Sequence, residues 1–510
     1  MSFISSRQAV MLIIIIGSLL RGILGASIGL GVDESYVVSV ARMFSLSYFD
    51  HPPLHFWVIW LTTHFTNSEN GLVLRLPFIA MFAGTTWMMY RLATRLFGEW
   101  AGVYAALILN ISAVFSLSTG SWILPDGPLM FLMMATTLVL EQLFFSSEAN
   151  PSWQLWVVAG LLVGLGMLAK YHAVFLAAGS FIFMLTSSKR RPMLLTVGPY
   201  LAVIIAGLVF LPVVIWNQEH GWISLLFQSG RGAAKGFFPL HMLGNIAGQA
   251  AWVLPWIWGP LVWSLIKAIL AGPGDKIKNP VQDRQWFLCC LASGPIAVFT
   301  IMTLWGAQGL FHWQAPGYLL ALPLLGRATV GWLQEGRLLT RWWLKISTIV
   351  FLVIVSILGS HTANGWIRQV EPQWFLKGDP TLEALDWRDL PGGLADKGLL
   401  NSGATFVVAA HWIDAGKIDY ALGGKVPVVC LSNEPHHFTF MHNLAEFTGK
   451  DALIIGSKQR LGDVTRYQPY FTSIEPADTV QIKRAGIAEV DVIVFYAKGF
   501  KGTFPLPYGQ

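Results

Sequence analysis

The sequence predicts a polytopic α-helical membrane protein that ends in a soluble α/β domain. Hydrophobic residues make up 54% of the 510 residues and charged residues 12%, a composition too apolar for a soluble chain. Long apolar segments recur through residues 1–363, and crossing a bilayer takes roughly 20 helical residues. These segments lack the alternating pattern of barrel strands, so helices must satisfy their backbone polar groups in lipid.

About eleven transmembrane helices are expected, counted as apolar runs of membrane-spanning length. We interpret the first as a retained anchor and not a cleaved signal peptide, because its apolar run is long and further spans follow. The fifth and sixth are separated by a short polar break at Lys170. The expected spans are residues 8–30, 72–91, 99–118, 126–145, 154–170, 171–187, 194–215, 243–268, 286–305, 313–331 and 344–362.

Lysine and arginine residues are divided unevenly between the two sides of the predicted membrane region. Loops on one side are rich in them, as at Arg91, Arg95 and residues 189–191, and loops on the other side carry few. By the positive-inside rule the N-terminus is cytoplasmic, and an odd number of spans places the C-terminal part outside. We therefore expect a multi-pass protein of the bacterial inner membrane with a periplasmic C-terminal domain. The net charge of +6 is then mainly a topology signal, and no nucleic-acid partner is indicated.

The composition divides the chain into two domains. Residues 1–363 form the transmembrane domain, which includes an extracytoplasmic loop at residues 31–71. Residues 364–510 have a soluble pattern, in which short apolar runs predict buried strands and the segments between them predict helices or loops. The expected strands are residues 404–410, 426–431, 451–455 and 490–496, with helical or loop segments at 412–422 and 434–447.

An acidic segment follows the first span. Asp33 and Glu34 are expected near the lipid headgroups, and Asp50 and His51 follow further along the same loop. A carboxylate in this position can take a proton from a hydroxyl or hold a cation. The alternative interpretation is that these acids only cap helices.

Two helices are expected to lie along the membrane surface in this loop, at residues 35–46 and 54–65. The second is rich in aromatic side chains, as interfacial helices are. Together they would form a shallow roof over a lipid-accessible cavity.

A second acid and several cations complete the candidate site. Asp126 begins the fourth span, where an acid is also a common helix cap. Arg21 lies within the first span, where it either extends to the headgroups or pairs with a lipid phosphate or Asp33. Lys170 and Arg231 are expected on the outer side, where they can bind phosphate or form ordinary salt bridges.

Short motifs recur along the chain on the predicted outer side of the membrane. The motifs are Asp33-Glu34, Tyr48-Phe-Asp-His-Pro-Pro53, Pro125-Asp-Gly-Pro128, Gly164-Leu-Gly-Met-Leu-Ala-Lys-Tyr171, Trp216-Asn217 and His312-Trp-Gln-Ala-Pro-Gly-Tyr318. Taken together, these motifs resemble those of the polyprenyl-phosphate-sugar-dependent C-type glycosyltransferases, of the protein-mannosyltransferase-like and aminoarabinose-transferase-like kind. The match extends over nearly the whole chain and is weakest in the C-terminal domain.

The resemblance implies inverting transfer of a sugar from a polyprenyl-phosphate donor to an acceptor hydroxyl, in lipopolysaccharide, an envelope lipid or a glycan. Asp33 is expected to be the base and Asp126 to orient the acceptor or sugar, so these two are the predicted catalytic residues. The prenyl tail is expected to lie in a groove along the helices, anchored by burial, and membrane lipids are a further expected partner. The predicted substrate-binding residues are Glu34, Arg21, Asp50, His51, Lys170, Tyr171, Arg231 and His312.

Three alternatives remain open. Asp50, His51 and His55 offer mixed oxygen and nitrogen ligands for a divalent cation, although the sequence does not require one. A protein O-mannosyltransferase would share the same motifs. A polytopic lipid or solute transporter would also be helical, but its ionisable groups should lie near the middle of the membrane in repeated, broken helices.

Overall fold

The computed structural model describes residues 4–146, 152–232, 235–274, 280–306, 309–505 and 507. The described residues divide into two compact units. The first unit contains residues 1–23, 51–55 and 75–354, and the second contains residues 24–50, 56–74 and 355–510. The boundary in the first loop falls between Asp50 and His51, so these neighbours in sequence belong to different units.

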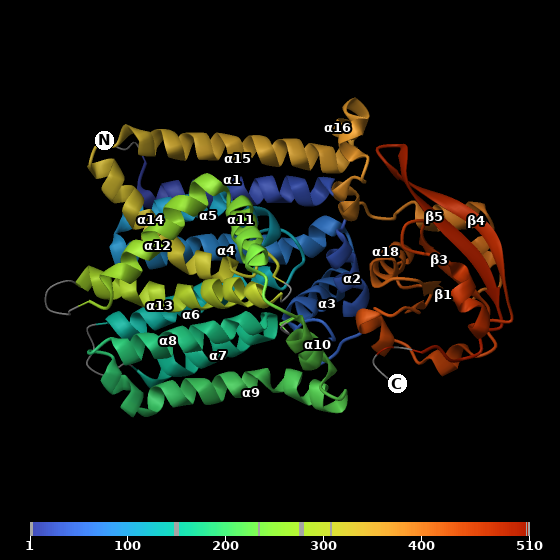
Figure 1. Cartoon of the computed structure of the whole chain (residues 1–510), viewed down its shortest axis with the longest axis horizontal. Coiled ribbons are helices and arrows are strands. Elements are labelled where there is room, and N and C mark those ends of the chain that lie inside the picture. Colours follow the sequence, from blue (N-terminus) through green and yellow to red (C-terminus); the bar gives the residue numbers. More distant parts are fainter. Residues whose placement is uncertain are drawn as a thin grey trace. The chain divides into compact units, whose positions relative to one another are not determined.

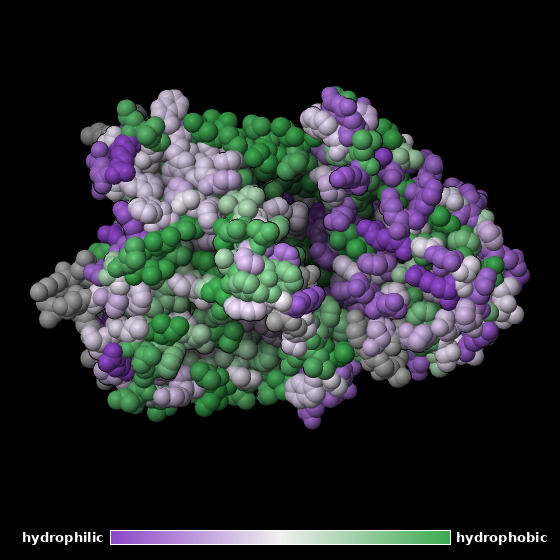
Figure 2. Space-filling model, viewed as in Figure 1, coloured by the Kyte–Doolittle hydropathy of each residue, from purple (hydrophilic) through white to green (hydrophobic). Residues whose placement is uncertain are grey.

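The first unit is built from long, mostly apolar helices (Figure 1). Many of their leucine and isoleucine side chains are exposed, for example Leu19 and Leu208 at 62% and 56%, as expected for helices that face lipid. Figure 2 shows such apolar side chains over α15. Its helices, some of which continue into the second unit, are α1 (Ser6–Ser27), α4 (Gly71–Phe97), α5 (Glu99–Ile111), α6 (Asp126–Phe145), α7 (Trp153–Ala169), α8 (Val174–Thr186), α9 (Val197–Glu219), α10 (Ile223–Arg231), α11 (Pro239–Val253), α12 (Pro255–Ala271), α13 (Pro280–Ile301), α14 (Ala315–Gln334) and α15 (Leu338–Asn364).

Among the described residues, six helices are long and apolar enough to cross a membrane, or seven if the bent pair α11 and α12 is one span. Three shorter apolar helices, α5, α7 and the segment Tyr171–Thr186, accompany them. The chain is therefore a multi-pass membrane protein, and the figure of about eleven spans stays a prediction.

The predicted single span at residues 243–268 is wrong in shape. The chain bends by 110° between α11 and α12. Pro255 begins α12, and the preceding Leu254 has a φ of 81°. Proline has no amide hydrogen to continue a helix and keeps the preceding residue out of the helical region, which explains the break.

The second unit contains a five-stranded mixed sheet with the strand order β2-β1-β3-β5-β4. Its strands are β1 (Phe406–Ala409), β2 (Val428–Cys430), β3 (Ala452–Ser457), β4 (Ser473–Arg484) and β5 (Ile487–Lys498). The parallel strands β1, β2 and β3 are buried along their whole length, as the continuous apolar runs in the sequence require. The predicted strands are thus confirmed, and β4, which alternates exposed polar and buried residues, was not anticipated.

Helix α18 (Trp412–Leu422) of this unit packs closely on α2 (Val32–Ala41). A Cβ atom added to Gly416 would lie 2.9 Å from the Cα of Tyr36, so glycine permits this contact. Ser39 also donates a hydrogen bond to the Gly416 carbonyl, at 3.2 Å. Helix α2 is consequently buried, which corrects the predicted surface helix at residues 35–46.

The remaining predicted elements of the second unit can be compared with the helices and turns of the structure. The segment at residues 412–422 is helical, as α18, and α3 (Leu54–Thr66) matches the second helix expected in the loop. Residues 434–447 form two short 3-10 turns joined by loop, within the helical or loop pattern predicted there. Short helices α16 (Trp366–Val370) and α17 (Leu390–Asp396) complete the unit.

Candidate functional sites in the two units

A buried ion pair links the start of α6 to the end of α7 in the first unit. Asp126 is the first residue of α6, and Lys170 follows the last residue of α7. The Lys170 Nζ lies 2.9 and 3.0 Å from the two carboxylate oxygens of Asp126. The two side chains are 8% and 5% exposed, so each charge depends on the other for its compensation.

Further basic groups surround this pair. The ring of His172 stacks on Phe299 with 4.4 Å between centroids, and Phe299 in turn lies 5.5 Å from Trp313. The guanidinium of Arg231 stands over the Trp313 ring at 5.2 Å. The structure therefore brings together residues that lie far apart in the sequence.

His312 belongs to the same cluster. Burial lowers its pKa to about 4, and the positive charges of Lys170 and Arg231 act in the same direction, while Asp126 opposes them. The imidazole is therefore neutral at pH 7 and can exchange hydrogen bonds without adding charge. We define Asp126, Lys170, His172, Arg231 and His312 as the basic cluster.

Two other predicted residues lie at the edge of this cluster. His51 contributes to the electrostatic field at His172, and its ring lies 5.7 Å from that of His55. Tyr171 rests edge-on against Phe210 at 6.1 Å.

Arg21 does not extend to the membrane surface, since the residue is 3% exposed. Its guanidinium donates to Asn110 Oδ1 at 3.1 Å and to Ser116 Oγ at 2.8 Å, and it lies over the Phe82 ring at 4.1 Å. These contacts tie α1 to α4, α5 and the turn after α5. The alternative in which Arg21 extends to the headgroups is therefore wrong, and Arg21 is a buried cation held by protein groups. Its role in binding the substrate stays a prediction.

The second unit holds the acids of the first loop. Glu34 caps α2, because its Oε2 accepts a hydrogen bond from the amide of Gly31 at 2.7 Å. The capping alternative is therefore the correct one for Glu34. Asp33, in contrast, is exposed to solvent.

The surroundings of Asp33 disfavour its charged form. Its pKa is raised to about 6, first by loss of hydration and then by the negative charges of Asp50, Glu383 and Glu34, against a smaller opposing effect of His436. Because the residue is accessible to solvent, repulsion among the acids is the firmer of these causes. Asp33 is thus an accessible carboxylate that can change its protonation state near neutral pH.

A buried network lies beside Asp33 in this unit. The Tyr36 hydroxyl donates to Asp50 Oδ1 and accepts from the amide of His437 at 3.1 Å. The Nδ1 atom of His437 accepts from the amide of Phe49 at 3.2 Å. The C-terminal domain thereby fixes the conformation of the first loop around Asp50.

Sequence reasoning did not single out this network. His436 has a φ of 51° and its ring lies 4.5 Å from Trp412 and 5.9 Å from Tyr36. A non-glycine residue with this conformation is uncommon and is often found at functional sites. The adjacent histidines of Pro435-His-His-Phe438 were a visible signal in the sequence. Their partner Tyr36, however, lies 401 positions before His437, so no local pattern connects them.

No group of three or more metal-binding side chains occurs among the described residues. The suggested set of Asp50, His51 and His55 does not form such a group. The Asp50 carboxylate instead accepts a hydrogen bond from the Tyr36 hydroxyl, and its Oδ1 atom lies 3.9 Å from His436 Nδ1.

Comparisons with known proteins agree with this architecture. Residues 50–216 match the family model described as dolichyl-phosphate-mannose-protein mannosyltransferase. The chain is 27% identical to the lipid A galacturonosyltransferase RgtD of Rhizobium johnstonii over 56% of this chain. It is 22% identical to the lipopolysaccharide core galacturonosyltransferase RgtB of the same organism, over 72% of this chain and 78% of that protein.

The match to RgtD spans 58% of that protein's length. Among solved structures, ArnT from Cupriavidus metallidurans bound to undecaprenyl phosphate is similar over 95% of this chain and 97% of that chain. The TM-score is 0.61 and the sequence identity 13%, so this likeness concerns the fold. The family model and the curated relatives match parts of the chain, and the chain shares the fold of ArnT, so these comparisons support the resemblance to the polyprenyl-phosphate-sugar-dependent C-type glycosyltransferases.

Proposed function

We propose that this protein is an inverting glycosyltransferase that moves a sugar from a polyprenyl-phosphate donor to a hydroxyl of lipopolysaccharide or its lipid A part. The curated relatives carry names that specify lipid A and the lipopolysaccharide core as acceptors and a galacturonosyl group as the transferred sugar. A polyprenyl-phosphate galacturonic acid is therefore the first donor to test. We further propose that the reaction takes place on the periplasmic face of a bacterial inner membrane.

The observation that carries this proposal is the accessible carboxylate of Asp33. An acceptor hydroxyl is a very weak acid, so a base must take its proton as the new bond forms. A carboxyl group with a pKa of about 6 is mostly ionised at pH 7 and is still a stronger base than an ordinary aspartate. Asp33 is the proposed general base.

In the proposed reaction the acceptor oxygen attacks the anomeric carbon of the donor sugar. The proton passes from that oxygen to Asp33, the bond from the anomeric carbon to the phosphate oxygen breaks, and its electron pair stays on the polyprenyl phosphate. The configuration at the anomeric carbon inverts because the incoming and outgoing oxygens occupy opposite faces.

The departing phosphate gains negative charge, which the basic cluster is suited to stabilise. Lys170 is buried and Arg231 is half-buried, and both supply positive charge where little water is present to screen it. Asp126 is proposed to hold Lys170 in place through its two short contacts. His51, Tyr171 and His312 are proposed as hydrogen-bonding groups for the donor.

The experiment is mass spectrometry of envelope lipids from cells with and without the gene, complemented by wild type or Asp33→Asn. The proposal predicts a sugar-modified lipopolysaccharide species that appears with wild type and not with Asp33→Asn. Asp396→Asn is the matched control, since Asp396 is an exposed acid of the same unit. Identical lipid profiles in all strains would contradict the proposal.

A protein O-mannosyltransferase is the second candidate, because the matching family model bears that description. The same strains distinguish the two. Modified glycoproteins with unchanged envelope lipids would favour the second candidate.

A further inference from the structure

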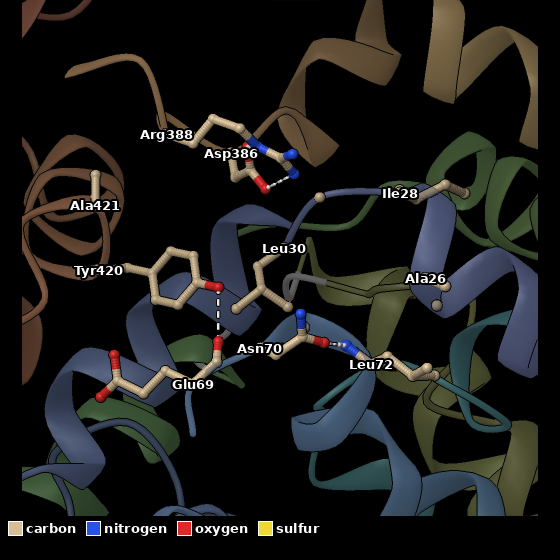
Figure 3. Close-up of a pocket in the computed structure, with 13 residues that line it drawn as sticks. Ala26, Ile28, Leu30, Glu69, Asn70, Leu72, Asp386, Arg388, Tyr420 and Ala421 are labelled. Carbon is tan, nitrogen blue, oxygen red and sulfur yellow. Dashed lines mark hydrogen bonds and ion pairs between the residues drawn. The ribbon is translucent and has the colours of Figure 1, made fainter. Parts of the chain in front are cut away.

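A pocket of about 430 Å³ opens in the second unit beside the end of α1 (Figure 3). One side is formed by Ile28 and Leu30, which follow α1, and another by Asn70 and Leu72 at the start of α4. The remaining wall comes from the C-terminal domain. Asp33 does not line this pocket, so the pocket is distinct from the proposed base.

The wall between α1 and the C-terminal domain is held by a buried lysine. Lys417 Nζ donates to the carbonyls of Leu30, Glu383 and Leu385 at 2.6, 2.9 and 2.8 Å. Gly29 permits this close approach, because a Cβ there would lie 2.7 Å from the amide of Asp386. These contacts hold the segment after α1 against the C-terminal domain at this wall.

The opposite wall is held in the same way. The Tyr420 hydroxyl donates to the Glu69 carbonyl at 2.9 Å, as the dashed line in Figure 3 marks. The Glu69 carboxylate is bound by Arg42 Nε and Nη2 at 2.8 and 2.7 Å. Glu69 therefore acts as a fixed part of the wall, and its carboxylate is paired with Arg42, which also pairs with Asp419.

Three groups remain to contact a ligand. Arg388 is paired with Asp386 through two contacts of 2.7 Å, yet its side chain is 76% exposed. The side-chain Oδ1 of Asn70 accepts a hydrogen bond from the backbone amide of Leu72 at 3.0 Å. Figure 3 shows the side-chain nitrogen of Asn70 pointing away from Leu72. The same view shows the Tyr420 ring extending toward Leu30, with its hydroxyl above the Glu69 carbonyl.

This combination favours an uncharged, hydroxyl-rich ligand. A neutralised arginine–aspartate pair offers donors and acceptors side by side, and an amide adds a further donor. An aromatic ring supplies an apolar face for the carbon–hydrogen side of a sugar. A bare anion would find Arg388 already paired and Asp386 opposing it.

The position of the pocket indicates how the ligand is anchored. The apolar helix α1 ends at Ser27 and α4 begins at Gly71, and both are candidate membrane spans. Their ends lie where lipid headgroups meet water. A ligand in this pocket can therefore have its sugar held by protein while its acyl chains stay in the bilayer.

We propose that this pocket binds a sugar residue of the glycolipid acceptor through Asn70, the Asp386–Arg388 pair and Tyr420. This inference rests on the proposed function and adds a subsite that selects the acceptor. Occupation of the pocket should change how tightly the acceptor binds, without changing the chemistry at the base or the binding of the donor.

Kinetics in proteoliposomes provide the test, with purified full-length protein, a polyprenyl-phosphate sugar and lipid A as the acceptor probe. Three variants alter the pocket: Arg388→Gln removes the guanidinium, Asn70→Asp keeps the oxygen that caps α4 but removes the donor, and Ala421→Trp narrows the space. Lys397→Gln is the control, because Lys397 pairs with Asp478 in a different recess of the same unit.

The proposal predicts that each pocket variant raises the KM for lipid A about tenfold or more, with kcat and the donor KM within about twofold of wild type. A glucosamine disaccharide without acyl chains should bind wild type detectably and Ala421→Trp much more weakly. Unchanged acceptor KM in all three variants would overturn the proposal. So would competition by inorganic phosphate and none by the disaccharide, which would show an anion site.

Failure of the proposed function looks different. If wild-type protein transfers no sugar to lipid A, the function is wrong for this acceptor. The disaccharide binding measurement then still decides whether the pocket is a sugar site, since it does not depend on turnover.

Discussion

Lys170 Nζ contacts both carboxylate oxygens of Asp126, and the two side chains are almost completely buried. Each charge would be costly without the other, since removing one member of a buried pair typically costs about 3–5 kcal/mol. A pair of this kind combines stability with function, because it holds a positive charge at a defined place.

Either single substitution, Asp126→Asn or Lys170→Gln, should destabilise the protein by a few kcal/mol, about 3–5 by the same reasoning. The double variant should recover most of this loss, because it leaves no uncompensated charge. Sugar transfer should be lost in Lys170→Gln and in the double variant, since Lys170 is needed for the departing phosphate, and reduced in Asp126→Asn, where Lys170 loses the two contacts that hold it in place. Thermal unfolding in detergent and the proteoliposome assay measure the two effects, and a double variant as unstable as the sum of the singles would argue against the pair.

Asp33→Asn should leave the protein at least as stable as wild type above pH 6. The pKa of Asp33 is raised from 3.8 to about 6, so the folded state binds the proton of Asp33 more tightly than the unfolded state does. The protonated carboxyl group therefore stabilises the folded protein below pH 3.8, and this stabilisation is lost as the pH rises through about 6. The neutral amide avoids the repulsion from Asp50 and Glu34. Thermal unfolding at pH 5 and pH 8 should show the larger gain at pH 8, and a loss of stability at pH 8 would show that the charge is compensated.

The pH dependence of transfer should report the same group. A base acts only when deprotonated, so kcat should fall as the pH is lowered through about 6. The fall should be about tenfold for each pH unit below that value. A profile that is flat from pH 5 to pH 8 would remove Asp33 from the base role.

Lys417 should make the stability of the protein depend on pH in the alkaline range. Burial lowers its pKa from 10.5 to about 7, so the folded state holds its proton less tightly than the unfolded state. Stability should therefore rise between pH 7 and pH 10.5, and be lost again as the pH falls through about 7. Lys417→Met should flatten this rise in a series of unfolding curves, and an unaltered slope would show that Lys417 is charged throughout.

Membrane orientation can be tested with single cysteines. Ser188 is exposed in the loop that follows α8, and Asp396 is exposed in the C-terminal domain. In intact cells, an impermeant thiol reagent should label Asp396→Cys and leave Ser188→Cys unlabelled. The native cysteines Cys289, Cys290 and Cys430 are buried, so wild type serves as the blank. The reverse labelling pattern would invert the proposed topology.

Local patterns in the sequence were sufficient to predict several elements. Hydrophobic length predicted the long helices, and short apolar runs predicted the buried strands β1, β2 and β3, because both signals depend on residues close in sequence. The bend between α11 and α12 was missed although Pro255 marks it, since the apolar run continues across the proline.

The candidate site was predictable in its residue types and not in its contacts. The acids and basic residues stand out because charge is rare in this chain, which drew attention to Asp33, Asp126 and Lys170. The partners of Arg21 and the network of Tyr36, Asp50 and His437 depend on tertiary packing between distant segments. No local pattern encodes such contacts.

The most direct test of the account is single-turnover sugar transfer by purified Asp33→Asn in proteoliposomes, compared with wild type and Asp33→Glu. The account predicts that the Asn variant binds donor and acceptor normally but transfers at a rate lower by about 10²–10⁴-fold, with partial recovery in the Glu variant. Transfer by Asp33→Asn at the wild-type rate would contradict the central claim that Asp33 is the base.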